Sequence, residues 1–259
     1  MAATMTRALL LFAAVLGSLA VAAAHADSVG TLQVNGTFRV NFSPADCPAG
    51  TPVTTNCYRN VSAGDGVVPG LGKVTTAFTL FYDDFGSACG HVHAQIPLLV
   101  AGKGEIDLAT RSIGCITPDQ LTRFPPSEVT VSGGSGLYAG ASGSGMLNYQ
   151  NYEKGPGTGS SILTWTGTLN VAGLTFDTIP PQIAGATSKA VKTRLAKGAR
   201  VRYSVSATDA TDGPVHAVCL PKSGSVFRVG RTRVTCTAVD SNGNTATTRF
   251  VITVKRVRR

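Results

Sequence analysis

The sequence has few charged residues and few aromatics: 14% of its 259 residues are Asp, Glu, Lys or Arg, and 7% are Phe, Trp or Tyr. A coiled coil is excluded, because its heptads need abundant Glu, Lys and Leu. Intrinsic disorder is excluded because 43% of the residues are hydrophobic and the charge density is low. Outside the N-terminal segment, no window of helical length carries an apolar stripe of period 3.6, which disfavours a helical fold.

Acidic residues become scarce after the middle of the chain. Residues 179–259 hold 15 Lys and Arg against 3 Asp and Glu, whereas residues 27–178 hold 7 against 11. The change coincides with Pro180-Pro181, two residues that cannot continue a β ladder and that stiffen a connection. We therefore expect two units, residues 27–176 and 180–255, joined by a linker over 177–179 and followed by a basic tail, 256–259.

The first residues have the order of a secretory signal peptide. Arg7 precedes an apolar run over residues 8–24, and Ala24-His25-Ala26 gives a small-x-small cleavage pattern ahead of Asp27. A membrane anchor is the alternative, but the run is at the short limit of a span, about 17 residues. We expect residues 1–26 to be removed and the mature chain to be extracellular.

An even number of cysteines in an exported chain predicts disulfides, here three. If the two units fold separately, Cys219 must pair with Cys236. The other four cysteines allow three pairings, of which we favour the local ones, Cys47–Cys57 and Cys89–Cys115. A zinc site lacks any C-x-x-C pair, and we expect neither a metal nor a cofactor.

Both units are predicted to be β. Alternating apolar and polar residues recur between turn-forming clusters of Gly, Pro, Asn and Asp, as in antiparallel barrels and sandwiches. The clearest segments of the first unit are 37–42, 74–82, 128–131 and 161–171, and those of the second are 200–205, 215–219, 231–239 and 245–254. Several short strands in roughly 80 residues favour an immunoglobulin-like sandwich for the second unit.

Residues 177–255 contain, in order, DTIPPQI, SATDATDGPV and VCLPKSGSVFRVGRTRVTCTAVDSNGNTATTRFVITV. This set resembles the hyalin repeat, or HYR, domain. The resemblance implies an immunoglobulin-like fold found in extracellular proteins and linked to adhesion, with no catalytic residues. The segment 189–202 departs from the pattern by being unusually cationic.

The arginines of the second unit are candidates for binding an anionic partner. A solvated sheet face is the alternative explanation. The candidate residues are Arg200, Arg202, Arg228, Arg231 and Arg233.

Three aspartates of the same unit lie near predicted turns. Asp209, Asp212 and Asp240 suggest calcium, but capping of turn backbone is the favoured interpretation, since Ca²⁺ takes about six to eight oxygens.

The first unit contains the glycine-rich segment 132–145, within which GSGLYA formally fits a dinucleotide-binding pattern. No helix is expected after it to hold a pyrophosphate, so we interpret it as a tight β connection. Its sequence GGSGLYAGASGSG resembles a segment of the dirigent and allene oxide cyclase families. That resemblance implies an eight-stranded, calycin-like antiparallel barrel.

The sequence thus predicts an all-β chain: a barrel followed by an immunoglobulin-like sandwich. We expect a secreted, non-catalytic binding or adhesion protein whose basic unit engages an anionic surface, an acidic polysaccharide or a protein partner. Nucleic acid is disfavoured by export and by the lack of interleaved exposed aromatics. The alternative is a barrel that carries a small apolar ligand or acts as a dirigent- or cyclase-like enzyme. Its candidate residues are His91, His93, Glu105 and Tyr138.

Overall fold

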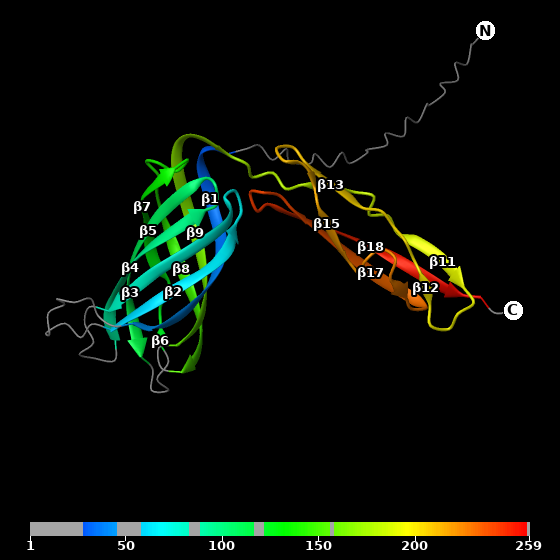
Figure 1. Cartoon of the computed structure of the whole chain (residues 1–259), viewed down its shortest axis with the longest axis horizontal. Coiled ribbons are helices and arrows are strands. Elements are labelled where there is room, and N and C mark those ends of the chain that lie inside the picture. Colours follow the sequence, from blue (N-terminus) through cyan, green and yellow to red (C-terminus); the bar gives the residue numbers. More distant parts are fainter. Residues whose placement is uncertain (1–27, 46–57, 83–88, 117–121, 156–157, 258–259) are drawn as a thin grey trace, which may run out of the picture.

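The computed structural model describes residues 28–45, 58–82, 89–116, 122–155 and 158–257. The predicted signal peptide and the cysteines Cys47 and Cys57 lie outside these residues. The described chain is all β, and no helix in it is long and apolar enough to cross a membrane. Two β units follow one another along the chain, the first drawn in blue to green and the second in yellow to red (Figure 1).

The first unit is a closed antiparallel barrel of eight strands. Strands pair in the order β4-β3-β2-β1-β9-β8-β7-β5, and β4 also pairs with β5, which closes the ring; the short β6 extends β5. The strands are β1 (Ser28–Ala45), β2 (Tyr58–Val68), β3 (Gly72–Tyr82), β4 (Cys89–Val100), β5 (Gly104–Ile116), β6 (Thr122–Arg123), β7 (Ser127–Gly136), β8 (Ser142–Gly155) and β9 (Thr158–Phe176). The predicted barrel is confirmed, and closure gives each of the eight described ring strands a neighbour on both sides, which avoids the unpaired edges that favour aggregation.

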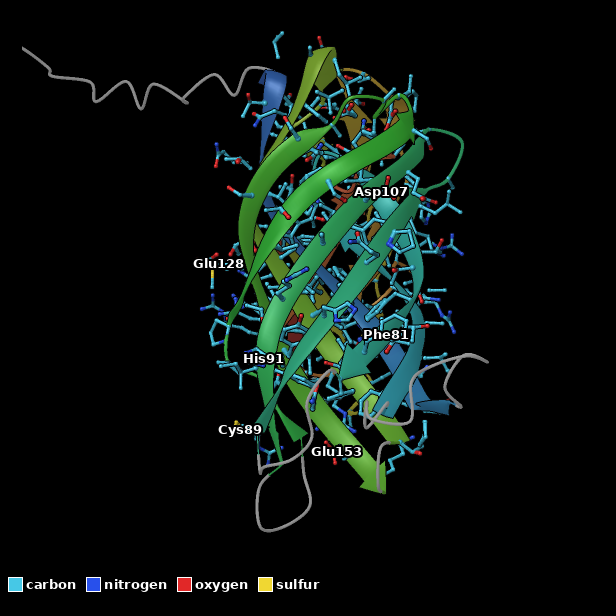
Figure 2. All side chains as sticks on the ribbon, turned by 90° about the vertical axis from the view of Figure 1, so that its left-hand side faces the viewer. Phe81, Cys89, His91, Asp107, Glu128 and Glu153 are labelled. Carbon is cyan, nitrogen blue, oxygen red and sulfur yellow. A yellow bond between two sulfur atoms is a disulfide. The ribbon has the colours of Figure 1, made fainter. Side chains whose placement is uncertain are left out.

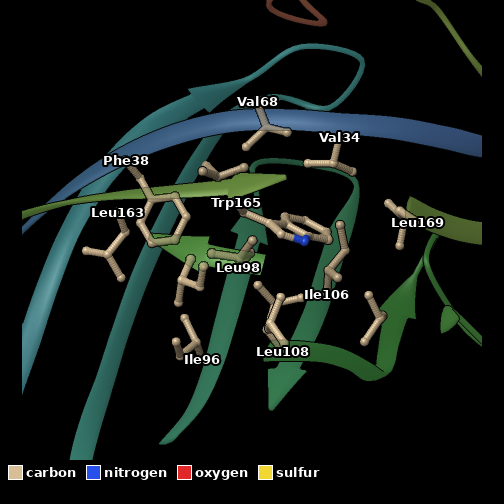
Figure 3. Close-up of a cluster of buried hydrophobic side chains, with 14 of the residues drawn as sticks. Val34, Phe38, Val68, Ile96, Leu98, Ile106, Leu108, Leu163, Trp165 and Leu169 are labelled. Carbon is tan, nitrogen blue, oxygen red and sulfur yellow. The ribbon is translucent and has the colours of Figure 1, made fainter. Parts of the chain in front are cut away.

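Side chains fill the inside of the barrel. Along β4 every second residue is buried, from Gly90 to Val100, while the residues between them face outwards. Trp165 of β9 is fully buried at the centre, among aliphatic side chains from the surrounding strands (Figure 3). The alternation that identifies the strands in the sequence is thus the pattern that builds the core.

The glycine-rich segment is a tight β connection, as predicted. It links β7 to β8 through a turn, and no helix follows it. A Cβ at Gly134 would lie 2.6 Å from the carbonyl oxygens of both Glu105 and Tyr138. Gly136 adopts a φ of 63°, in the left-handed region that favours glycine. Only glycine lets the neighbouring backbone segments of this chain approach one another this closely.

The second unit is a sandwich of short strands around a separate core. One layer is the sheet β11-β18-β17-β15, and the other consists of the two small sheets β10-β13-β14 and β12-β16. The strands are β10 (Gln182–Ala184), β11 (Lys189–Thr193), β12 (Ala199–Arg200), β13 (Ser206–Asp209), β14 (Gly213–Val215), β15 (Ala217–Leu220), β16 (Val226–Phe227), β17 (Gly230–Val239) and β18 (Thr245–Arg256). Its core joins Val201 and Phe227 to Val234, Phe250 and Ile252.

Two predicted disulfides are present, Cys89–Cys115 and Cys219–Cys236. In each, the cysteines lie directly opposite each other on paired strands, β4 with β5 and β15 with β17. Each bond therefore fastens one pair of neighbouring strands within one unit.

The two units meet at the tip of the β17–β18 hairpin, which reaches the barrel (Figure 1). Lys103, in the turn between β4 and β5, donates hydrogen bonds to the carbonyl oxygen of Leu71 and, at 2.5 Å, to Oδ1 of Asn242. The backbone is also close there: a Cβ on Gly72 would lie 2.3 Å from the carbonyl oxygen of Ser241. The tip of the hairpin is thus held against two turns of the barrel, between β2 and β3 and between β4 and β5.

Candidate functional site

Three of the four barrel candidates face outwards. His91 and His93 alternate with buried residues of β4, and Glu105 alternates with buried Ile106 on β5, so all three point away from the core. Figure 2 shows His91 on the outside of the barrel. His93 stacks on Phe81 with ring centroids 5.2 Å apart. The pKa of Glu105 is raised, first by a hydrogen bond with Asp107, then by burial and by the charge of Asp107. These residues do not converge on an interior cavity.

Tyr138 lies in the turn between β7 and β8, where its side chain is buried. Burial raises its pKa from 10.0 to about 12. Its backbone amide donates a hydrogen bond to Ser135, and its carbonyl oxygen accepts one from Ala141. In the described part of the chain, no hydrogen bond joins Tyr138 to a catalytic group. Tyr138 closes the end of the barrel core.

A small pocket lies among the strands of the barrel. Its walls include Phe42, Phe78, Phe124 and Tyr149, and the buried hydroxyl of Ser161, which also lines it, has no hydrogen-bond partner. Its volume is about 30 Å³, which is room for about one water molecule and far below the roughly 300 Å³ of a small-molecule site. In the part of the chain that the structure describes, this pocket is too small for an organic ligand.

The outer face of the sheet β11-β18-β17-β15 gathers positive charge. Val234, Cys236 and Ala238 of β17 are buried, so the alternate residues Arg231 and Arg233 point outwards. On β18, Phe250, Ile252 and Val254 are buried, and the odd-numbered residues between them face outwards. Arg249 and Lys255 extend this outward series, and Lys192 of β11 lies opposite Lys255. These five side chains are exposed.

The strand register places the five cations in a continuous row that runs from β11 across β18 to β17 and back to β18. Thr235 lies opposite Arg249, so Arg233 is the diagonal neighbour of Arg249; Arg231 lies opposite Thr253 and is in turn diagonal to Lys255. Diagonal neighbours on one face of a sheet are about 7–8 Å apart. No acidic residue occurs on these four strands. The row is therefore a strip of like charge, and the four described strands of this sheet supply no carboxylate to neutralise it.

The remaining predicted arginines belong to the other layer. Arg200 and Arg202 flank buried Val201, whose side chain enters the core that the two layers share, so both arginines point away from the strip. Arg228 follows buried Phe227 of β16 and is exposed in the same layer. The guanidinium of Arg200 donates a hydrogen bond to the carbonyl oxygen of Gly224, at 2.9 Å. Of the five arginines selected from the sequence, the structure brings Arg231 and Arg233 together on the strip.

Sequence reasoning missed Arg249 as a member of this surface. The alternation of polar and apolar residues along β18 could have indicated that Arg249 faces outwards, since Arg249 precedes apolar Phe250 as Arg233 precedes apolar Val234. What the sequence alone lacks is the register, because any slip by one residue would reverse the faces.

A second polar feature lies at the opposite end of the same unit. Asp177, Asp209 and Asp240 are all buried, and each offers a carboxylate oxygen within 4.8 Å of those of the other two. The predicted capping is present: Oδ1 of Asp209 accepts hydrogen bonds from the amides of Thr211 and Asp212. The pKa of Asp240 is raised chiefly by burial, against hydrogen bonds from Asn244 that lower it, and further by the charges of Asp177 and Asp209.

Comparison with known proteins agrees with the motif analysis of the second unit. Residues 176–254 match the family model of the HYR domain, so the predicted resemblance is confirmed. This match and the two disulfides are typical of an extracellular type of domain.

Other comparisons are sparser. A search of curated proteins finds no match. Among solved structures, a pterocarpan synthase dirigent protein matches with 12% sequence identity and a TM-score of 0.35, covering 57% of this chain and 90% of that protein. A TM-score at this level does not by itself establish a common fold.

Proposed function

We propose that this chain is a secreted, non-catalytic adhesion protein that binds an anionic extracellular polymer through the cationic strip of its HYR unit. The strip is the row Lys192, Lys255, Arg231, Arg233 and Arg249 on the outer face of β11, β18 and β17. The HYR match supports the adhesion-type role. The strip supports the choice of an anionic partner.

The observation that carries the proposal is the crowding of like charge. Lys192 and Lys255 lie directly opposite each other on neighbouring strands, and the arginines continue the row. Like charges placed opposite one another destabilise a sheet. No acidic residue on these strands offsets that cost, but a bound polyanion would.

The chemistry of the strip favours sulfate or carboxylate groups on an extended chain. Arginine forms paired hydrogen bonds with such groups, and the diagonal steps of about 7–8 Å from Lys255 to Arg231 and from Arg233 to Arg249 can be matched by groups repeated along a polysaccharide. Exposed Val218 and Leu220 of β15 border the strip and add apolar surface for sugar rings. We therefore favour an acidic polysaccharide as the partner.

The test compares two variants of the full chain that lose the same number of charges. One is Arg231→Gln/Arg233→Gln/Arg249→Gln, on the strip; the control is Arg200→Gln/Arg202→Gln/Arg228→Gln, on the other layer. Both are eluted from a sulfated polysaccharide matrix by a salt gradient. We expect the strip variant to elute at much lower salt than wild type, because fewer polymer charges are neutralised, and the control to shift much less.

Equal shifts of the two variants would overturn the proposal, because they would show attraction by net charge without a defined surface. Failure of the wild-type chain to bind at low salt would do the same. Circular dichroism of each variant confirms that the sandwich has folded. In the described part of the barrel, side chains fill the interior, so nothing there favours ligand transport or catalysis.

A further inference from the structure

Three buried carboxylates meet where the two units join. Asp177 belongs to the connection after β9, Asp209 ends β13, and Asp240 follows β17. Their exposed fractions are 7%, 4% and 8%, respectively. Because the three segments are far apart in the sequence, the fold itself brings these charges together.

The hydrogen bonds of Asp177 and Asp240 come from backbone amides and from two asparagines. The carboxylate of Asp177 accepts from the amide of Ile179 and from Nδ2 of Asn242. Both oxygens of Asp240 accept from Asn244, one from its backbone amide and one from its side chain. Within the described residues, none of the three carboxylates forms an ion pair with a lysine, arginine or histidine.

Asp209 supplies an independent sign of a missing partner. Its Oδ1 accepts from the amides of Thr211 and Asp212, at 2.8 and 3.0 Å. Its Oδ2 is buried and has no hydrogen-bond partner. Oδ1 is already satisfied by the loop amides, so Oδ2 is the oxygen of Asp209 that still lacks a partner beside the other two carboxylates. A buried carboxylate oxygen without a donor or a cation is costly.

We propose that Asp177, Asp209 and Asp240 bind one Ca²⁺ ion at the junction of the two units. Carboxylate oxygens are the ligands that this hard cation prefers, and water completes its coordination. Two oxygens bound to one Ca²⁺, each about 2.4 Å from it, lie at most about 4.8 Å apart. One oxygen of each carboxylate lies within 4.8 Å of the other two, so all three can reach a single ion. The ion satisfies Oδ2 of Asp209 and offsets the mutual repulsion of the three carboxylates.

Magnesium fits this arrangement less well. Its bonds to oxygen are shorter, about 2.0–2.1 Å, and it retains several water molecules in a strict octahedron. Zinc in structural sites is usually held by nitrogen and sulfur ligands, and no histidine or cysteine joins this cluster. The ligand chemistry therefore selects calcium.

The site would act on the join between the two units. Asn242 links Asp177 to Lys103 of the barrel, because its Nδ2 donates to Asp177 and its Oδ1 accepts from Lys103. The loop from Asp240 to Asn244 also binds the connecting segment, since Nδ2 of Asn244 donates to the carbonyl oxygen of Asp177. Bound Ca²⁺ thus ties the connection and this loop together and restrains the orientation of the two units.

The experiment titrates the full chain, freed of metal with a chelator, with Ca²⁺ in a calorimeter and follows its thermal unfolding. We expect one ion per chain and a Tm increase of about 5–10 °C when Ca²⁺ is at a hundred times its Kd. Asp209→Asn should lower the affinity at least tenfold. Asp212→Asn is the matched control, because Asp212 neighbours the cluster but contacts Ser241 through its carboxylate; its affinity should equal that of wild type.

A measurement in chelator separates binding from simple structural damage. Without metal, Asp209→Asn should unfold at the wild-type Tm or above, because it removes a buried charge, and it should then gain little from Ca²⁺. Absence of heat and of a Tm shift at millimolar Ca²⁺ would overturn the proposal. So would equal losses of affinity in the two variants, or equal affinity for Mg²⁺. None of these outcomes depends on the cationic strip, so the proposed polymer binding is tested separately.

Discussion

At the scale of single residues, buried hydroxyl groups without partners are weak points of the barrel core. Thr76 of β3 is buried, and its Oγ1 has no hydrogen-bond partner. Replacing this hydroxyl with a methyl group in Thr76→Val removes an unsatisfied polar atom at nearly constant shape. We expect the barrel to gain about 1 kcal/mol in free energy of unfolding, measured by denaturant titration. Thr75→Val, on the exposed side of the same strand, should change it little; a loss in Thr76→Val would contradict this account.

Tyr138 makes the stability of the barrel sensitive to alkaline pH. Burial raises its pKa to about 12 in the folded chain, against an ordinary value of 10.0. Between these values the unfolded chain loses the phenolic proton and the folded chain keeps it, so stability falls as pH rises. Below pH 10 both states are protonated and the effect disappears.

Tyr138→Phe should therefore lose less stability than wild type between pH 10 and pH 12, by on the order of 2 kcal/mol. The measurement is denaturant unfolding at a series of alkaline pH values. Tyr149 also has a pKa raised by burial, and it remains in both proteins, so the difference between them isolates Tyr138. Parallel curves for the two proteins would show that this phenol is not responsible.

At the scale of elements, each described disulfide fastens one strand pair and should stabilise only its own unit. The pairs are separated by 26 and 17 residues in the sequence, for which the chain-entropy model gives about 3 kcal/mol each. Cys89→Ser/Cys115→Ser should lower the unfolding free energy of the barrel by this amount and leave the sandwich unchanged. Cys219→Ser/Cys236→Ser should do the opposite. Tryptophan fluorescence reports the barrel, since Trp165 is the one tryptophan of the chain. An equal loss of stability in both units of either variant would contradict this prediction.

The sequence was sufficient for elements whose signal is local. Alternation predicted the strands around residues 74–82 and 231–239, which appear as β3 and β17. It was wrong for residues 200–205, where only Arg200 and its predecessor form a strand and the rest bond to a loop: the amide of Val201 donates to Ser225, and that of Tyr203 to the hydroxyl of Ser223. The parallel pairing of β11 with β18 was not predicted either. The loop contacts of residues 201–205 and the pairing of β11 with β18 both depend on which distant segment packs beside them. The alternation of apolar and polar residues carries no information about that.

At the scale of the whole molecule, both the cationic strip and the cluster of three aspartates were only partly predictable, because each depends on segments that are distant in the sequence. The excess of cations was visible in composition, but the strip required the register of β17 and β18. Turn capping by Asp209 and Asp240 was predicted from neighbouring residues and is present. The meeting of these residues with Asp177, 32 and 63 positions away in the chain, required the packing of the connection against the second unit. Local chemistry was therefore predictable, and its convergence was not.

Asn242 is the residue through which the two units should be coupled. Its side chain accepts from Lys103 of the barrel and donates to Asp177 of the connection. Asn242→Ala removes both hydrogen bonds, one of which involves a charged donor and the other a charged acceptor. In chelator, so that metal binding does not contribute, we expect the free energy that couples the two units to fall by about 1–3 kcal/mol.

Differential scanning calorimetry should show this loss as a wider separation between the unfolding transitions of the two units. Thr247→Ala, on the exposed outer side of β18 and away from the junction, is the control and should leave the separation unchanged. If Asn242→Ala also left it unchanged, the contact would not couple the units, and an ion bound beside it would have no orientation to restrain.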